Sequence, residues 1–269
     1  MGKAYRSETE RQLAAAYDAF HTARASTTLV AQLYAEAMGD AYPHELNASG
    51  TCDWPLLGTA VGRLRMRPDQ LLVDLGCGTG GVGLWLARAL AVSLVGIDIS
   101  ARAVDLAGDR VARFVAPGRA EFQVGTLEAT GLPEARADGA VCIDALAFAP
   151  HRLNALTEIR RILRPGARIV ITSGVRRTHS IAPTWPEQAA AAGLELESEE
   201  ERPEEPAMLH RLYRLWVERE ADLRRELGDQ QAQNMLDEAR RRSRNLGNRR
   251  AVVVTLKRPV DEDPPHTTP

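Results

Sequence analysis

The sequence predicts an α/β protein built on a doubly wound, mostly parallel sheet. An apolar run at residues 71–73 is followed by a glycine-rich turn and by a helical pattern that extends to about residue 90. Short apolar segments and helical segments then alternate as far as residue 198, and one more apolar segment follows at 251–257. Strands that alternate with helices are typical of a parallel sheet with helices on both faces.

Local patterns predict each element in order. The segments expected to be strands are short, apolar and bounded by turn residues, and they lie at 71–73, 93–97, 120–124, 141–143, 168–172, 194–198 and 251–257. Helical spacing predicts a region at 12–38 that Ser26-Thr27-Thr28 divides, and helices at 55–64, 100–114, 154–163 and 187–192. Ser100 is the expected N-cap of its helix. The polar segment 206–246 predicts two helices that Gly228 separates.

Composition limits the classes of function. The 269 residues are 44% hydrophobic, which is enough for a core, and the net charge of −2 favours neither nucleic acid nor a membrane surface. The three cysteines, Cys52, Cys77 and Cys142, are isolated and lack the spacing of a metal site. They indicate a reducing cytoplasm without disulfides, and we expect no bound metal. No apolar run is long enough to cross a membrane, and the N-terminus is too polar for a signal peptide.

The glycine-rich turn is compatible with two kinds of cofactor. Gly76, Gly78 and Gly81 fit the G-x-G-x-x-G pattern of dinucleotide-binding proteins, which is a weak signal alone. However, the Asp74 carboxylate precedes the first glycine by two residues, where it would repel a pyrophosphate and attract an ammonium group. S-adenosylmethionine offers an ammonium group and a ribose without a phosphate. This argument favours S-adenosylmethionine over a nicotinamide cofactor, and so disfavours an oxidoreductase.

The segment Asp74-Leu75-Gly76-Cys77-Gly78-Thr79-Gly80 closely resembles the first motif of class I S-adenosylmethionine-dependent methyltransferases. Leu163-Arg164-Pro165-Gly166 before a strand and Gly131-Leu132-Pro133 after the third strand also recur in that family. The resemblance covers roughly residues 68–200 and 251–258. It implies a seven-stranded Rossmann-like sheet in which an antiparallel last strand lies between the fifth and sixth strands.

The resemblance also implies a domain organisation. Residues 1–66 are expected to form an N-terminal helical cap, and residues 67–258 the methyltransferase core. Within this core, residues 206–246 are expected to form a helical lid over the acceptor, with the stripe from Leu209 to Leu227 packed on Leu13, Tyr17 and Phe20. A homodimer through this insertion stays open as an alternative. The tail at 259–269 is rich in proline and acidic residues and is expected to be disordered.

The cofactor site is expected at the carboxyl ends of the strands, where open α/β sheets bind their ligands. The resemblance implies that Asp74 serves the amino group and that Asp98 accepts hydrogen bonds from both ribose hydroxyls. Thr126 departs from the family, which usually has an acid there for the adenine amino group. The full set of expected cofactor-binding residues is Asp74, Gly76, Cys77, Gly78, Thr79, Gly80, Asp98, Ile99, Gly125, Thr126, Leu127, Asp144 and Ala145.

Methyl transfer from a sulfonium is an in-line displacement that depends largely on positioning in a dry site. A hydroxyl acceptor usually needs a general base, and His179 and His151 are the candidates because they follow predicted strands at the ligand-binding edge. For each histidine, an exposed loop residue without a catalytic role is an equally good interpretation. The acceptor pocket is expected to use the aromatic residues Tyr17, Phe20, Trp54 and Trp216.

We therefore expect an S-adenosylmethionine-dependent methyltransferase that acts on a small organic acceptor in specialised, natural-product metabolism. One alternative is an RNA or protein methyltransferase, although neither the net charge nor the arginines at 240–250, which are typical of a solvated helix end, favour nucleic acid. A second alternative is a protein that binds S-adenosylmethionine without methylating anything.

Overall fold

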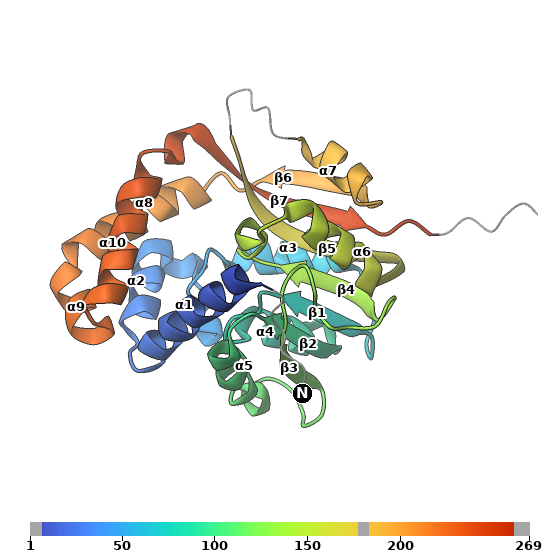
Figure 1. The fold of residues 1–269 in the computed structure, drawn as a ribbon, viewed down its shortest axis with the longest axis horizontal. Coiled ribbons are helices and arrows are strands. Elements are labelled where there is room, and N and C mark those ends of the chain that lie inside the picture. The colour runs from blue at the N-terminus through green and yellow to red at the C-terminus, as the bar shows by residue number, and fades with distance from the viewer. Residues whose placement is uncertain (1–6, 177–182, 261–269) are drawn as a thin grey trace, which may run out of the picture.

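The computed structural model describes residues 7–176 and 183–260. One seven-stranded sheet forms its centre, with the strand order β3-β2-β1-β4-β5-β7-β6 (Figure 1). The strands are β1 (Leu71–Leu75), β2 (Ser93–Asp98), β3 (Ala120–Val124), β4 (Ala137–Cys142), β5 (Leu163–Arg176), β6 (Glu195–Glu201) and β7 (Arg249–Lys257). Strands β1 to β5 are parallel to one another, and β7 pairs antiparallel with both β5 and β6. The predicted fold class is confirmed, including the position of the last strand.

Helices cover both faces of this sheet. Apolar residues of α6 (Arg152–Ile162) and α7 (Trp185–Ala191) pack against one face, where Val73 and Ile169 are fully buried. On the other face, α3 (Trp54–Leu64) and α4 (Gly81–Leu90) pack against Leu72 and Val170. Helix α5 (Ala101–Gly108) lies against β2 and β3, and Ser100 caps it by accepting a hydrogen bond from the Ala103 N–H, as predicted. Burial of alternate residues on opposite faces is what the strand periodicity requires.

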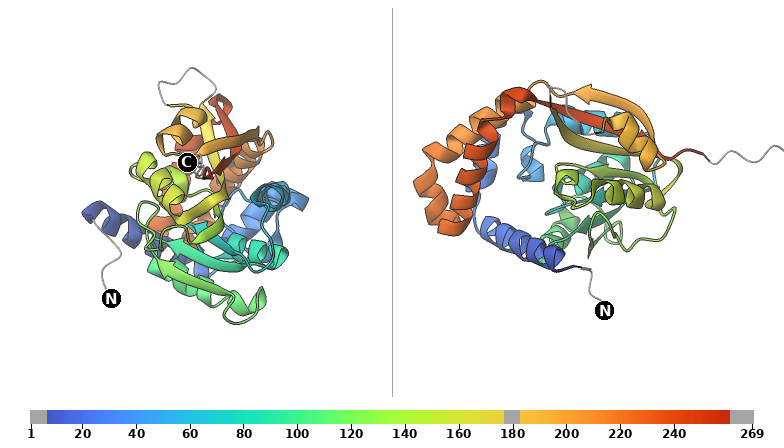
Figure 2. Two further views of the ribbon diagram at one scale, coloured as in Figure 1. Left: turned by 90° about the vertical axis from the view of Figure 1, so that its right-hand side faces the viewer. Right: turned by 45° about the horizontal axis from the view of Figure 1, so that its top comes forward.

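The remaining helices form an arc at the carboxyl end of the parallel strands (Figure 2). They are α1 (Glu8–Ala25), α2 (Leu29–Met38), α8 (Glu205–Glu218), α9 (Glu220–Leu227) and α10 (Asp229–Ser243). The predicted break between α1 and α2 is present. The Asp18 carboxylate on α1 accepts hydrogen bonds from the Ser100 hydroxyl and the Arg102 N–H, over 2.6 and 3.0 Å. These bonds hold α1 against the N-terminus of α5, beside the glycine-rich turn.

Three sequence-based expectations about elements need correction. Strand β5 is longer than 168–172, because it includes Arg164-Pro165-Gly166 after an irregular start and continues to Arg176 by pairing with Arg249 of β7. The insertion contains three helices, since α8 and α9 are separated at Arg219. Its apolar residues also pack on α2 in one cluster with Leu33 and Tyr34, rather than on the stripe of Leu13, Tyr17 and Phe20. The expected disordered tail lies outside the described residues from position 261 onward.

Candidate functional site

The arc of helices and the carboxyl end of the sheet enclose a cavity of about 1870 Å³. The sheet side is lined by the turn after β1 and by the segments after β2, β3 and β4. Residues of α1, α2, α8 and α10 line the opposite side. A ligand site at this edge is the expected one for an open parallel sheet, because the carboxyl ends of the strands and the following helix N-termini meet there.

The glycine-rich turn needs its glycines for steric reasons. Gly76 has a φ of 72°, and a Cβ atom on it would lie 2.2 Å from the Cβ of Ala145. The Gly76 and Cys77 N–H groups both donate to the carbonyl of Ile97, which turns the chain around the end of β2. Gly78 has a φ of 52°, and a Cβ atom on it would lie 3.7 Å from Cε1 of His21 on α1. The turn therefore presents bare backbone to the cavity.

Asp74 is buried near the end of β1, and only one of its two carboxylate oxygens is engaged in a hydrogen bond with a described residue. Its Oδ2 accepts a hydrogen bond from the Gly83 N–H over 3.0 Å, and Oδ1 has no hydrogen-bond partner among the described residues. Burial, against the opposing effect of the Gly83 bond and with a smaller contribution from the charge of Asp98, raises the pKa of this carboxyl to about 7. An ammonium group beside Oδ1 would favour the ionised form, so the carboxylate fits the amino group of S-adenosylmethionine.

Asp98 ends β2 and holds the turn in shape. Its Oδ2 accepts from the Gly78 N–H over 2.8 Å, and its Oδ1 accepts from the Ser100 N–H over 2.9 Å. Burial raises the pKa of this carboxyl, while these backbone bonds lower it. Each carboxylate oxygen can accept a further hydrogen bond. Asp98 thus has a structural role that the sequence did not reveal, and it keeps the capacity to bind two ribose hydroxyls.

Thr126, the departure from the family pattern, has a buried hydroxyl at the wall of the cavity. It follows β3, pairs with Ala129 through its backbone and lines the cavity. Its Oγ1 is buried and has no hydrogen-bond partner among the described residues. A buried hydroxyl of this kind normally has a partner. Together with Asp74, Asp98 and the bare glycine turn, this unpaired hydroxyl shows that the residues present fit an S-adenosylmethionine molecule; Ile99, Gly125 and Leu127 line the same region.

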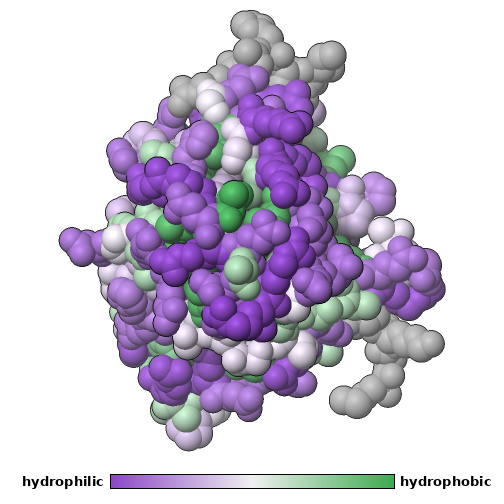
Figure 3. All heavy atoms as spheres, turned by 90° about the vertical axis from the view of Figure 1, so that its left-hand side faces the viewer, coloured by the Kyte–Doolittle hydropathy of each residue, from purple (hydrophilic) through white to green (hydrophobic). Residues whose placement is uncertain are grey.

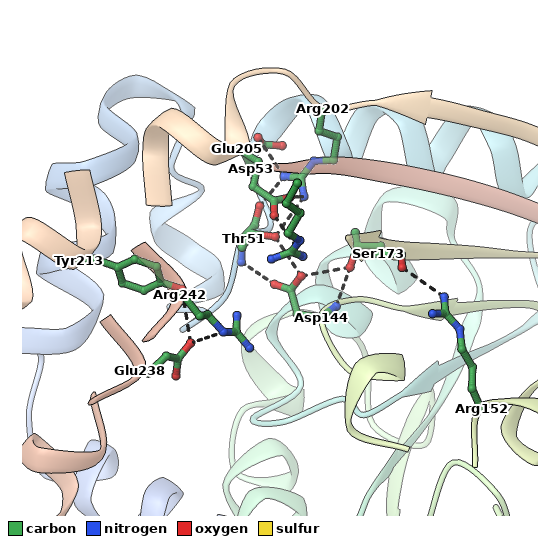
Figure 4. A network of polar contacts seen from close by, with 12 residues as sticks. Thr51, Asp53, Asp144, Arg152, Ser173, Arg202, Glu205, Tyr213, Glu238 and Arg242 are labelled. Carbon is green, nitrogen blue, oxygen red and sulfur yellow. Dashed lines mark hydrogen bonds and ion pairs between the residues drawn. The ribbon is translucent and has the colours of Figure 1, made fainter. Parts of the chain in front are cut away.

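Asp144 uses its carboxylate in a way that the sequence did not predict. The residue has a φ of 57°, and its Oδ1 accepts hydrogen bonds from the hydroxyls of Thr51 and Thr172, over 2.9 and 3.0 Å. Its Oδ2 accepts from the Thr51 N–H over 2.5 Å. Figure 4 shows these contacts beside Arg202, which donates to the Thr51 hydroxyl and to Asp53. Asp144 therefore anchors the loop before α3, although it also lines the cavity.

The other candidate residues divide into three groups. Tyr17, Phe20 and Trp216 line the cavity, as expected for an acceptor pocket. Trp54 does not: it is 40% exposed and stacks edge-on with Trp85, away from this cavity. The side chain of His151 is 72% exposed next to Glu128 and does not line the cavity. His179 lies outside the described residues.

The sequence reasoning did not single out His21 and Arg24, which also line the cavity. Both share a helix face with Tyr17, because the spacings of four and seven residues return to the same side of α1. That spacing was the available signal. Burial, and then the nearby charge of Arg24, lower the pKa of His21 to about 4, so its imidazole is neutral at pH 7.

Comparison with known proteins identifies relatives of part of the chain. Residues 72–166 match a family model described as a methyltransferase domain. An O-methyltransferase of Pyrenophora dematioidea is 35% identical over 111 residues, which cover 41% of this chain and 42% of that protein. The 27-O-demethylrifamycin SV methyltransferase of Amycolatopsis mediterranei is 28% identical over 164 residues, covering 61% of this chain and 58% of that protein. The chain thus spans about half the length of the curated relatives it matches.

Solved structures with the same fold match more of the chain. The crystal structure of the [4+2]-cyclase SpnF has a TM-score of 0.73 at 20% identity and covers 97% of this chain and 100% of that one. The cyclopropane synthase MmaA2 from Mycobacterium tuberculosis has a TM-score of 0.65 at 17% identity, covering 81% of this chain and 86% of that one. At these sequence identities the two structures are evidence for the fold alone. The match to SpnF extends over the helices of the arc as well as the sheet.

Proposed function

Because the chain contains a class I S-adenosylmethionine-dependent methyltransferase domain, we propose that it transfers a methyl group from S-adenosylmethionine to a small organic acceptor. One observation carries the proposal: the buried carboxylates of Asp74 and Asp98 and the unpaired Thr126 hydroxyl lie at one side of a cavity that helices close on the other. When bound, S-adenosylmethionine supplies a methyl group activated by a positively charged sulfur.

The residues of the chain contribute mainly by positioning. Asp74 binds the amino group, Asp98 binds the ribose hydroxyls, and Thr126 offers its hydroxyl to the adenine. The aromatic residues Tyr17, Phe20 and Trp216 exclude water and hold the apolar part of the acceptor. Among the described residues that line the cavity, His21 is the one histidine, and an imidazole with a pKa of about 4 is a weak base. Orientation, rather than proton removal by histidine, is the contribution that the described residues support.

The acceptor is a small molecule rather than RNA. Several of the arginines at 240–250 have acidic neighbours: Arg240 is 3.3 Å from Asp237, and Arg250 is 3.0 Å from Glu199. The surface formed by the arc of helices is mostly hydrophilic, with small and separate hydrophobic spots (Figure 3). None of the described helices has the length and apolar character to span a membrane. The relatives described as an O-methyltransferase and as the 27-O-demethylrifamycin SV methyltransferase support an organic acceptor of this kind.

The insertion forms a lid over the acceptor in this proposal. Its apolar stripe, Leu209, Leu212, Trp216, Leu223 and Leu227, is buried within the chain against α2, so the stripe needs no second copy to cover it. Leu209 and Trp216 also line the cavity. These two observations favour the lid over the dimer that the sequence left open.

A second candidate function is catalysis of a ring closure without methyl transfer. It is favoured by the likeness to the [4+2]-cyclase SpnF over nearly the whole chain, including the arc of helices. The presence of S-adenosylmethionine in the site does not by itself separate the two functions.

The test is incubation of the purified protein with methyl-labelled S-adenosylmethionine and fractionated metabolite extracts. We expect label in an organic product, and we expect calorimetric binding of S-adenosylmethionine but not of NAD. Substrate consumption without transfer of label would favour the cyclase function. Binding of NAD without binding of S-adenosylmethionine would refute both.

A further inference from the structure

Arg24 is a cavity residue whose positive charge has no partner. It lies near the C-terminal end of α1, and its Nη1 atom is buried without a hydrogen-bond partner among the described residues. The guanidinium stacks on the Phe20 ring, 3.7 Å from the ring centre. No ion pair or hydrogen bond of this side chain is found in the described part of the chain. The side chain as a whole is partly buried, and a cation at such a place without a counter-charge is unfavourable, so its presence needs an explanation.

Among the described residues, the one carboxylate that acts electrostatically on Arg24 already interacts with other residues. Glu238 of α10 is the carboxylate whose charge acts on Arg24. Its Oε1 is 3.3 Å from Arg242 and accepts a hydrogen bond from the Tyr213 hydroxyl over 3.4 Å (Figure 4). The other titratable groups that interact with Arg24 are the phenols of Tyr17 and Tyr34. Burial raises the pKa of both phenols, so both are neutral at pH 7 and offer no counter-charge. Burial lowers the pKa of Arg24 to about 10, which leaves it charged at pH 7.

Trp216 of α8 is a second residue lining the cavity that has a donor without an acceptor within the described ranges. Its Nε1 is buried and has no partner among the described residues. The ring of Tyr34, whose hydroxyl interacts electrostatically with Arg24, lies 6.3 Å from the ring of Trp216. Arginine and tryptophan side chains donate hydrogen bonds and cannot accept them. These two side chains can therefore bind a hydrogen-bond acceptor, and the charge of Arg24 favours an anionic one.

We propose that Arg24 binds a carboxylate of the acceptor, so that the substrate is an organic acid with an apolar body. This inference rests on the assignment of the cavity as the acceptor site in the proposed function. A planar guanidinium matches a carboxylate with two parallel hydrogen bonds, and the pair is strong where water is excluded. Apolar side chains of the same cavity suit the rest of the molecule: Phe20, against Arg24, and Val30, Leu209 and Met235 line it.

The position of Arg24 along α1 also orients the acid. His21, which lies over Gly78 of the glycine turn, precedes Arg24 by three residues. Three residues of helix rise by about 4.5 Å, so Arg24 is nearly one turn farther along α1 from the cofactor side. The carboxylate is thus held away from the methyl donor, and the group that receives the methyl lies toward the glycine turn. Methylation of the carboxylate itself is not expected.

The experiment measures binding to the ligand-free full chain, without methyl transfer. The probes are 2-naphthoate, 4-biphenylcarboxylate and indole-3-acetate, each compared with its primary amide by calorimetry and thermal shift. We expect at least one acid to bind at least tenfold more tightly than its amide. Arg24→Met should remove that preference, and Arg24→Lys should keep part of it. Arg240→Met, which makes the same change on an exposed position of α10 outside the cavity, should leave the preference intact.

Three results would overturn the proposal. They are equal binding of every acid and its amide, an unchanged preference in Arg24→Met, and tighter Arg24-dependent binding of 2-naphthyl phosphate than of 2-naphthoate. A further readout excludes a purely structural role. Ligand-free Arg24→Met should melt at or above the temperature of the unmodified protein, because it removes an unpaired and partly buried charge. A marked fall would also contradict the proposal.

Failure of the carboxylate proposal and failure of the proposed methyltransferase function give different experimental results. Failure of the methyltransferase assignment appears as absent S-adenosylmethionine binding or absent label transfer. Failure of the carboxylate assignment appears in binding of the acid probes, which needs neither.

Discussion

Thr51 and Asp144, 93 residues apart in the chain, are joined by two hydrogen bonds: the Thr51 N–H and hydroxyl donate to separate oxygens of the Asp144 carboxylate, over 2.5 and 2.9 Å. This contact ties the loop before α3 to the end of β4, at the wall of the cavity. Arg202 holds the same loop from the start of the insertion by donating to the Thr51 hydroxyl and carbonyl. The loop, the sheet edge and the insertion are therefore connected through Thr51.

Asp144→Asn should lower the free energy of unfolding by about 1–3 kcal/mol, because an amide cannot accept hydrogen bonds at both positions and leaves a donor unpaired. Asparagine tolerates the left-handed backbone conformation, so the φ of 57° at this position should not add to the loss of stability. Urea denaturation measures the change. The matched control is Asp69→Asn, at an exposed aspartate with a φ of 65°, where a change within about 0.5 kcal/mol is expected. Similar losses in the two variants would contradict the anchoring role.

Asp98→Ala should weaken binding of S-adenosylmethionine by about 2–3 kcal/mol through loss of the bonds to the ribose hydroxyls. It should also lower stability, because Gly78 and Ser100 lose the acceptor of their N–H groups. Calorimetry measures the first effect and thermal unfolding the second. Asp105→Ala, at an exposed position on α5, serves as the control and should change neither. An unchanged affinity in a folded Asp98→Ala protein would restrict Asp98 to shaping the turn.

Cofactor affinity should fall as the pH falls below about 7. The pKa of Asp74 in the free protein is raised to about 7, first by burial, so the carboxyl is largely protonated below that pH. Binding of an ammonium group requires the ionised form, and the proton must then be released, which weakens binding by up to about tenfold per pH unit. Burial also raises the pKa of Asp98.

Calorimetry in buffers of different ionisation enthalpy measures this proton release directly. Asp74→Asn should bind more weakly at pH 8 and should lose most of the pH dependence. Comparison of the two proteins cancels the titration of the cofactor itself. A pH dependence that is identical in both would show that Asp74 does not bind the amino group.

Trp216→Ala should destabilise the protein by about 3–5 kcal/mol, because a large buried ring is lost between α8 and α2. Trp216→Phe keeps most of that packing and removes an N–H that has no partner, so its stability should change much less. If the insertion is a lid, Trp216→Ala should also impair acceptor use at temperatures where the protein is folded. Val217→Ala is the control, since Val217 is 52% exposed on the same helix. Equal acceptor use in Trp216→Ala would remove the lid proposal.

The sequence by itself determined the sheet and the nature of the cofactor. Strand periodicity, helix capping at Ser100 and the spacing of Asp74 from the glycine turn are local features, and short-range sterics and hydrogen bonds decide them. For that reason β3 is found at its expected residues and the turn after β1 has its expected form. The position of β7 between β5 and β6 followed from the family resemblance rather than from any local pattern.

The tertiary structure alone decided how the cavity is walled. The pairing of α8 with α2, the exposure of Trp54 and the engagement of Asp144 by Thr51 depend on contacts between distant segments, which helical periodicity leaves open. A periodic pattern states which face of a helix is apolar but not which partner will cover it. The same reason explains why Arg24 was missed: an arginine of α1 gives no local sign that its Nη1 is buried beside a cavity that residues of α2, α8 and α10 also line.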